Sequence, residues 1–555
     1  MNARRCVTTA NTLYVGPHAQ PCREILPAVP AARPLAVTRV RDAAGQEYIL
    51  HLDRVVLRAP DGTEDALVAG PGGLPVADLT CLALAAAGEL WVGSRHGVCC
   101  CQHGRIELYA GRRWLADDDV HALECSPDGA ILVHTASGCT RLHFRTLTLA
   151  SKADHYEQLT DARHKRFNYV TGCQLRQPGD LTQSRQCTDD NDGLWTAMYV
   201  AAESFRFAVT GADEARGKAR TAMLALLELE RQTGIPGLPA RALAHRSEPE
   251  FGQARGGEWH RSADGEWEWK GDTSSDEIDG HYFAWGIYCD LVADAAEKEL
   301  ICATVRRVTD RIVQNGFTLP DLDGQPTRWG MWAPERLNAD PAWRAERGLN
   351  SLEVLSYLKT AAQLTGEAAY EATYRTLALD QHYALNTLRQ KALPGDFAGA
   401  EDNHSDDELA FLAYYNLLRY EQDPALRALY LASLERSWQI ERAEDCPLWN
   451  LIYGALSGRP CAAEAAVQAL QEIPLDLVNW PMVNSRRRDL VTAPATDRFD
   501  APQGVRPLPW RERPLHIWNG NPYRLDGGSG LSEECGTFWL LPYWLGRYHG
   551  ILAEA

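Results

Sequence analysis

Acidic and amide side chains gather at four places in the sequence, residues 188–192, 272–282, 348–351 and 401–408. Each place precedes or begins a segment with helical periodicity. Ser, Asp and Asn are preferred N-caps, and acids in a first turn offset the helix dipole, so one side chain per cluster has a structural explanation. Each cluster offers several such side chains, and the others are available for chemistry.

The spacing within residues 272–282 indicates which side chains could act together. Asp276, Asp279 and Tyr282 stand at i, i+3 and i+6, which predicts a shared helix face. Glu277 and His281 stand at i and i+4 and predict a neighbouring stripe. If these faces line a cleft, carboxylates, an imidazole and a phenol converge there, as acid and base groups do in active sites. Capping and catalysis both remain open as interpretations.

Two reactions could use such a set. Glycoside hydrolysis requires a carboxylic acid that protonates the leaving oxygen and a second carboxylate that acts as base or nucleophile. The candidates are Asp192, Asp276, Asp279, Asp406, Asp407 and Glu408. Polysaccharide β-elimination requires a group that neutralises the uronate and a Tyr or His that removes the C5 proton. The candidates are His281, Tyr282, Asn403 and His404. Because carboxylates outnumber the other candidates, we expect hydrolysis in preference to elimination.

The C-terminal part holds a segment with the composition of a sugar subsite. Residues 518–528 place Asn, Arg and Asp between aromatic residues, which combines planar hydrogen bonding with a stacking surface. A Gly-rich turn with a satisfied buried Arg is the alternative. The substrate-binding residues that we expect along the chain are Asp189, Trp332, Arg336, Asn350, Asn403, Trp518, Asn521, Tyr523, Arg524 and Asp526.

Bulk composition excludes several other classes of function. A net charge of −18 makes nucleic acid a poor partner, because phosphate binding needs a basic face, and the one locally basic run is residues 486–488. No apolar run is long enough to span a bilayer. The 17 Trp and 20 Tyr residues suit stacking on sugar rings as well as core packing. We therefore expect an oligo- or polysaccharide as the partner, with no nucleic acid and no membrane; the oligomeric state is not readable from these patterns.

Cysteine usage favours a reducing compartment. Fifteen cysteines, three of them consecutive at residues 99–101, do not form a disulfide framework, and the first residues lack the apolar region of a secretory signal. These features predict a cytoplasmic protein, although a sequence with its leader removed would look the same. The spacings typical of metal ligands and of nucleotide loops are absent, so we expect no metal and no cofactor.

The first 150 residues read as short strands joined by turns. Residues 79–93 and 120–133 look like copies of one unit, offset by about 40 residues, which is the spacing of propeller blades. The unit resembles the blades of two-component-regulator-type propellers, in which a strand and a D-G turn precede L-W-V-G. An earlier copy lies near Asp61. Three blades cannot close a normal propeller, so we expect a small accessory β domain over residues 1–150.

After residue 151 the hydrophobic period changes to about 3.6, and amphipathic segments follow in pairs with very short joins. About a dozen helices in this part predict an (α/α)6 toroid over residues 151–555. The joins between pairs are long, rich in Trp and Gly, and hold the polar clusters. Because long loops on a rigid scaffold carry function, the active face is expected where they lead into the first helix of each pair. The pairs are 192–209 with 213–232, 275–292 with 295–314, 348–364 with 367–385, 406–422 with 425–441, and 448–456 with 461–471.

In this pairing and loop pattern, residues 152–555 resemble the broad (α/α)6 superfamily that includes unsaturated glucuronyl hydrolases, other inverting glycosidases and many polysaccharide lyases. The resemblance implies catalytic Asp residues near the starts of inner helices, here Asp192 with Asp276 or Asp406. Two alternatives remain. One is a non-catalytic glycan-binding or sensory protein, which the blade-like repeats favour. The other is a toroid with unrelated chemistry such as terpene or peptide cyclisation, which the absence of a DDxxD motif disfavours.

Overall fold

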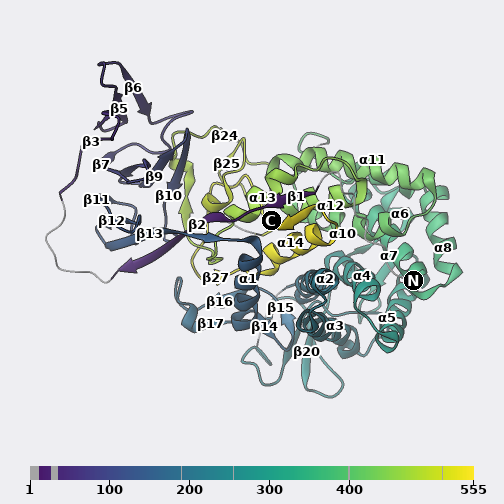
Figure 1. Ribbon diagram of the computed structural model, residues 1–555. Helices are drawn as coiled ribbons and strands as arrows, with labels where there is room; N and C mark the ends of the chain where they lie inside the picture. Colours follow the sequence, from purple (N-terminus) through teal and green to yellow (C-terminus); the bar gives the residue numbers. More distant parts are fainter. Residues whose placement is uncertain are drawn as a thin grey trace.

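The computed structural model describes residues 12–26, 35–188, 190–253, 256–397, 400–514 and 517–554. An all-β N-terminal region is followed by a predominantly helical region, which confirms the change of period read from the sequence (Figure 1). Two short strands at the ends of the chain, β1 (Leu13–Val15) and β28 (Leu552–Glu554), pair in parallel and tie the termini together.

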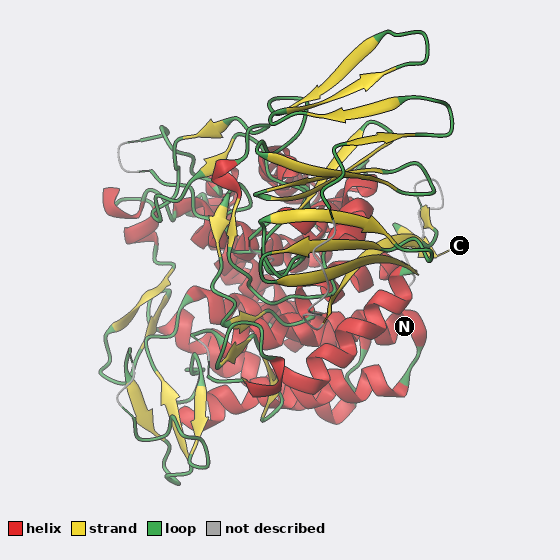
Figure 2. Ribbon diagram, turned by 90° about the vertical axis from the view of Figure 1, so that its left-hand side faces the viewer, coloured by secondary structure: helices red, strands yellow, loops and turns green. Residues whose placement is uncertain are grey.

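The N-terminal region contains three four-stranded antiparallel sheets, which follow one above another in Figure 2. The two sequence copies correspond to the hairpins β7–β8 and β11–β12, and each hairpin has a register shift at its start. Among the described residues these sheets close no barrel. The strand orders are β3 (Arg39–Arg41), β4 (Glu47–Leu50), β5 (Arg54–Arg58), β6 (Glu64–Val68); β10 (Arg105–Tyr109), β9 (Gly97–Gln102), β8 (Leu90–Ser94), β7 (Leu79–Leu84); and β11 (Val120–Cys125), β12 (Ile131–Thr135), β13 (Gly138–Leu147), β2 (His18–Leu26).

Six helices of the second region contact one another in a closed circle. Each contacts the next along the chain, and the last contacts the first. Most of their residues are buried, on apolar and polar faces alike, as expected for helices surrounded by others. In order, they are α2 (Asp192–Thr210), α4 (Ser275–Leu291), α7 (Arg347–Thr365), α10 (His404–Tyr420), α12 (Pro447–Ser457) and α14 (Thr537–Tyr548).

Each helix of this circle packs against an outer partner. The joins from α2 to α3 and from α7 to α8 are short because Gly211 and Gly366 end the inner helices in the left-handed conformation, at φ of 67° and 72°, which glycine adopts without steric cost. No helix in the described part of the chain is long and apolar enough to cross a bilayer. The outer helices are α3 (Asp213–Thr233), α5 (Ala295–Gln314), α8 (Ala368–Arg375), α11 (Pro424–Glu441), α13 (Ala463–Glu472) and α1 (Leu149–Arg163).

Except for the short join into α12, the joins that lead into the inner helices are long and contain small sheets and turns. They hold β18 (Leu243–His245), β19 (Trp259–Arg261) and β20 (Trp267–Lys270) before α4, and β21 (Thr318–Pro320), β22 (Pro326–Met331) and α6 (Pro334–Leu337) before α7. Further joins hold β14 (Lys165–Arg166), β15 (Tyr169–Val170), β16 (Cys173–Leu175) and β17 (Ser184–Arg185) before α2, α9 (Tyr383–Asn386) before α10, and β23 (Met482–Val483), β24 (Thr492–Ala493), β25 (Gln503–Gly504), β26 (Asp526–Gly527) and β27 (Ser532–Glu533) before α14.

A buried lysine connects the two regions. Lys152 of α1 is fully buried, and its ammonium group donates to the side chain of Gln20 in β2 at 3.0 Å. It also donates to the carbonyl oxygens of Leu470, Gln471 and Ile473 at the end of α13, at 2.5 to 2.9 Å. Carbonyls at a helix C-terminus lack partners within the helix, so one lysine satisfies several groups that water cannot reach.

We therefore expect Lys152→Met to destabilise the protein by about 3 kcal/mol, since it leaves buried carbonyls without donors while preserving the volume of the side chain. Chemical denaturation followed by circular dichroism measures this loss. Lys298→Met, on the exposed face of α5, is the matched control and should change the stability by no more than about 0.5 kcal/mol. Equal stabilities for the two variants would contradict this role of Lys152.

Candidate active site

Six carboxyl groups from three consecutive inner helices lie at the N-terminal ends of those helices. Asp279, Glu353 and Glu408 are buried, with at most 1% of each residue exposed. The other three, Asp276, Glu346 and Asp406, are only partly buried, so solvent reaches them. The helices are α4 with Asp276 and Asp279, α7 with Glu353 and the preceding Glu346, and α10 with Asp406 and Glu408.

The electrostatic influence of these groups on one another shows that they lie close together. Burial raises the pKa of Asp279 well above its usual value, and the charges of Glu353, Asp276 and Glu408 raise it further. Burial, with the charges of Asp276 and Glu346, raises the pKa of Glu353 to about 8. Carboxyl groups of α4, α7 and α10 therefore form one interacting set, in which some members keep a proton at neutral pH.

Residues in the loops that precede α4, α7 and α10 donate hydrogen bonds that orient one carboxyl group of each helix. Trp332 Nε1 donates to Glu353 Oε2 at 2.8 Å, and Ser274 Oγ donates to Asp276 Oδ2 at 2.9 Å. The Asn403 amide donates to Asp406 Oδ1 at 2.6 Å. A donor favours the ionised form of the carboxylate that it contacts, so the set combines protonated and ionised members. An acid and a base at one place can perform general acid–base catalysis.

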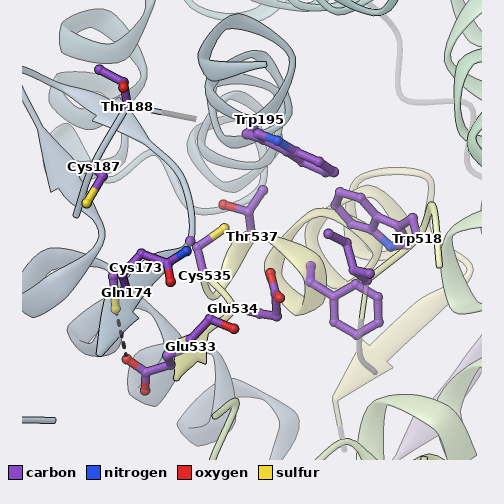
Figure 3. A pocket seen from close by; sticks show the side chains of 14 residues that line it. Cys173, Gln174, Cys187, Thr188, Trp195, Trp518, Glu533, Glu534, Cys535 and Thr537 are labelled. Atoms are coloured by element: carbon purple, nitrogen blue, oxygen red, sulfur yellow. Dashed lines mark hydrogen bonds between the residues drawn. The ribbon is translucent and has the colours of Figure 1, made fainter. Parts of the chain in front are cut away.

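An aromatic pocket of about 240 Å³ lies at the starts of α2 and α14. Figure 3 shows the indole rings of Trp195 and Trp518 on one side, with the carboxylate of Glu534 directed toward the space beside them. Glu533 points the opposite way, toward Cys173. Trp195 stands one turn after Asn191, whose side chain hydrogen-bonds Asp276, so the pocket and the carboxyl set occupy the same end of the helix circle.

Several predicted catalytic residues lie elsewhere. Asp192 is fully buried and forms an ion pair with Arg166 at 2.7 Å. His281 is stacked on Trp285 with ring centroids 5.1 Å apart, and burial lowers the pKa of its imidazole to about 3. The Tyr282 hydroxyl shares a hydrogen bond of 2.7 Å with Thr309 of α5, so this ring faces the outer helix layer. These three residues are built into the packing of the helices.

His404 belongs to a second acidic cluster, formed with Asp407 and Glu444 beside the carboxyl set. Asp406 and Asp407 are thus neighbours in sequence that contribute to different clusters. The structure therefore brings together Asp276, Asp279, Asp406 and Glu408 among the predicted catalytic residues, while His404 lies in the adjoining cluster.

Some of the predicted substrate-binding residues lie at the carboxyl set, and others lie away from it. Trp332 and Asn403 contact the carboxyl set directly, and Asn350 donates to the Met331 carbonyl at 2.9 Å beneath it. Arg336 pairs with Asp340 at the surface. Asp189 lies outside the described residues.

The C-terminal segment forms a network of turns around Trp518. Asn521 donates to Asp497 and Gln503, and Asp526 accepts from Ser485. Arg524 Nε donates to the Asp526 carbonyl at 2.7 Å. Tyr523 follows in the same turn, with its backbone N–H bonded to Asn521. Trp518 alone of the predicted residues in this segment lines the aromatic pocket of about 240 Å³ among the described residues.

Four residues of the site were missed by sequence reasoning: Glu346, Glu353, Trp195 and Glu534. Glu353 carried a usable signal, because a charged residue within the apolar stretch 349–358 must be buried if that helix is surrounded by others. Glu346 and Glu534 lie in loops just before helices, and Trp195 lies in the first turn of α2, positions whose role the hydrophobic period does not indicate.

Comparisons with known proteins place few constraints on this chain. No protein-family model matches it, and no curated protein is significantly similar in sequence. Among solved structures, Bacteroides ovatus GH9 covers 91% of this chain and 96% of its own, at 8% identity and a TM-score of 0.38. A family 76 glycoside hydrolase from a bovine Bacteroides thetaiotaomicron strain covers 89% of this chain and 88% of its own, at 7% identity and a TM-score of 0.38. Likeness at this level carries no argument about function.

The raised pKa of Glu353 predicts a pH dependence of stability. The folded state keeps a proton on Glu353 up to a pH of about 8, whereas the unfolded chain releases it near its ordinary pKa of 4.5, so stability is lost as pH rises through this window. Glu353→Gln keeps the shape but removes the titration. We expect the free energy of unfolding of this variant to fall less steeply between pH 5 and 8, by up to about 1.4 kcal/mol per pH unit.

Urea denaturation at several pH values measures this slope. Glu299→Gln, on the exposed side of α5, should leave the slope of the wild-type protein unchanged. An unchanged slope in Glu353→Gln would show that Glu353 is ionised in the folded protein at neutral pH.

Proposed function

We propose that this protein is a glycoside hydrolase and that its six inner and six outer helices form an (α/α)6 toroid. The observation that carries the proposal is the set of carboxyl groups from α4, α7 and α10, which interact with one another while three of them reach solvent. Hydrolysis of a glycosidic bond requires a proton donor and a carboxylate base or nucleophile in one cleft. Both kinds of group are present in this set.

We assign the acid and the base by their surroundings. Burial raises the pKa of Asp276, but hydrogen bonds from Ser274 and Asn191 and the guanidinium of Arg241 act in the opposite direction and favour a carboxylate. Burial, with the charges of Glu346 and Asp407, raises the pKa of Asp406 well above its usual value, which favours the protonated acid. In this assignment Asp406 protonates the leaving oxygen, and Asp276 activates water or attacks the sugar. The buried Asp279, Glu353 and Glu408 support these two groups from beneath.

The aromatic pocket supplies a surface for sugar rings. Trp195 is half-buried and Trp518 is almost fully buried, and both line the pocket beside Glu534. Apolar faces of pyranose rings pack on indole rings, while carboxylates and amides accept or donate hydrogen bonds to hydroxyl groups. We therefore propose an oligo- or polysaccharide as the substrate.

Polysaccharide elimination has less support. Two of its four expected residues, His281 and Tyr282, lie in the packed interior, where neither reaches the partly exposed acids by any contact among the described residues. The other two, Asn403 and His404, lie at or beside the carboxyl set. A sensory or glycan-binding role for the N-terminal sheets is compatible with hydrolysis, since those sheets precede the carboxyl set in the chain and contribute no member to it.

We expect Asp406→Asn and Asp276→Asn each to lower kcat by about 10²–10⁴-fold, because each removes a proton transfer or nucleophile while preserving shape. Release of reducing ends from a panel of neutral and uronate-containing glycans measures this activity. Absorbance from a new C4–C5 double bond, followed in parallel, would instead identify elimination. Asp154→Asn, on the exposed face of α1, should retain wild-type activity.

We expect Trp195→Ala to raise KM by about fivefold or more with a smaller change in kcat, since the lost stacking surface contributes about 1 kcal/mol of binding. Steady-state kinetics on the best substrate of the panel measures the split. Trp329→Ala, which removes a partly exposed indole from β22, is the control and should leave KM unchanged. An unaltered KM in Trp195→Ala would remove this pocket from the proposed binding site.

A further inference from the structure

A buried cluster beside the carboxyl set contains four carboxyl groups and one histidine. The ring nitrogens of this histidine form no hydrogen bond with any described residue. His404 begins α10 and is 5% exposed. Buried polar groups are nearly always satisfied, so an imidazole with both nitrogens unpartnered calls for an explanation. The carboxyl groups around it belong to Asp402, Asp407, Glu441 and Glu444.

The distances from His404 Nδ1 to two neighbouring carboxylate oxygens are similar to the distances between ligand atoms around a bound metal ion. His404 Nδ1 lies 3.5 Å from Glu444 Oε1 and 3.7 Å from Asp407 Oδ2, which is long for hydrogen bonds. One ligand atom from each of these three residues lies within 4.8 Å of the other two. Ligands bound at about 2.1 Å to a tetrahedral ion are about 3.4 Å apart, so an ion fits between these atoms with small movements.

The other ring nitrogen faces a further carboxylate. His404 Nε2 lies 3.6 Å from Asp402 Oδ2, and Asp402 Oδ1 pairs with the ammonium group of Lys391 at 3.0 Å. A histidine that ligates a metal through one nitrogen commonly donates its other N–H to a carboxylate, which fixes the tautomer and the ring orientation. Asp402 stands in that position.

The net formal charge of the cluster is also compatible with a bound cation. Its four carboxylates face two buried cations: Lys391, which pairs with three of them, and Arg513, whose guanidinium donates to the Glu444 carbonyl. With all four carboxyl groups ionised, the cluster would have four negative and two positive formal charges, and one divalent ion would balance the difference. Buried charges are costly unless they are compensated.

We propose that His404, Asp407 and Glu444 form a divalent-cation site, best suited to Zn²⁺, in which Asp402 orients the imidazole. One nitrogen and two oxygen ligands match the preferences of zinc better than those of Mg²⁺ or Ca²⁺, which take oxygen ligands. Glu444 also lines a small cavity with Trp449 and Trp518, so one ligand of the proposed site lies at the edge of open space. The sequence gives no motif for this site because its ligands come from two separate segments.

A second group of three residues in the described chain has metal-ligand side chains, but its histidine is already hydrogen-bonded, whereas His404 is not. One carboxylate in each group pairs with a basic side chain, Asp407 with Lys391 and Glu533 with Arg163. Glu533 accepts two hydrogen bonds from Arg163, at 2.7 and 2.8 Å, and His164 Nδ1 is bonded to the Thr171 carbonyl. Cys173 completes that group. It therefore serves as the control site, distinguished from the proposed one by its sulfur.

The test measures metal binding directly and is independent of any glycosidase activity. The purified full-length protein is treated with EDTA, dialysed, and titrated with Zn²⁺ while bound zinc is measured by calorimetry and mass spectrometry. We expect one equivalent in the wild-type protein, at least about 100-fold weaker binding in His404→Gln and Glu444→Gln, and about 10–100-fold weaker binding in Asp402→Asn. Cys173→Ser should bind as the wild type does.

Zinc-edge X-ray absorption of the loaded wild-type protein gives a readout that does not depend on the folding of any variant. Imidazole and oxygen neighbours without sulfur would support the site. A sulfur neighbour would assign the ion to the group with Cys173 and overturn the proposal. Failure of the folded wild-type protein to bind zinc, or undiminished binding by His404→Gln, would also overturn it.

Discussion

The arrangement of the helical region depends on holding several carboxyl groups close together where little water reaches them. Burial disfavours the ionised form of each group, and the neighbouring charges disfavour it further. Such groups remain together only if the backbone cannot relax and let them separate. The closed circle of inner helices supplies that constraint, since Asp279, Glu353 and Glu408 project from three consecutive members of it, each packed against an outer helix.

Helices and loops make different contributions to this site. The carboxyl groups stand just before or within the first two turns of inner helices, whereas the hydrogen-bond donors Trp332, Ser274 and Asn403 come from the long joins that precede them. Short joins with left-handed glycines keep the opposite ends of the helix pairs compact. This asymmetry explains why the long joins hold most of the polar residues: their side chains donate hydrogen bonds that orient carboxyl groups positioned by the rigid helices.

The sequence was sufficient to predict the all-β and helical regions, because the hydrophobic period changes from two to 3.6 and glycines mark the ends of several helices. It also predicted that Asp276 and Asp279 act on one face. It failed for Tyr282, since six residues on a helix turn by about 600°, which places Tyr282 about 120° away from Asp276 and toward α5. Asp192 and His281 were indistinguishable in sequence from active-site groups, because their partners Arg166 and Trp285 are identified only by tertiary packing. The catalytic roles of Asp276 and Asp406 stay predictions.

The first turn of α10 links the two acidic clusters. Successive residues on a helix diverge by about 100°, so Asp406 turns toward the partly exposed set while Asp407 turns toward Lys391 and His404. Lys391 pairs with Asp402, Asp407 and Glu441, which joins the loop before α10, the helix itself and the end of α11. Because the backbone of this turn is rigid, the contacts that hold Asp407 also determine where Asp406 stands. The contacts of the buried cluster around His404 therefore help to position the partly exposed carboxyl set. A substitution that weakens the buried cluster would displace Asp406 without removing any contact that Asp406 itself makes.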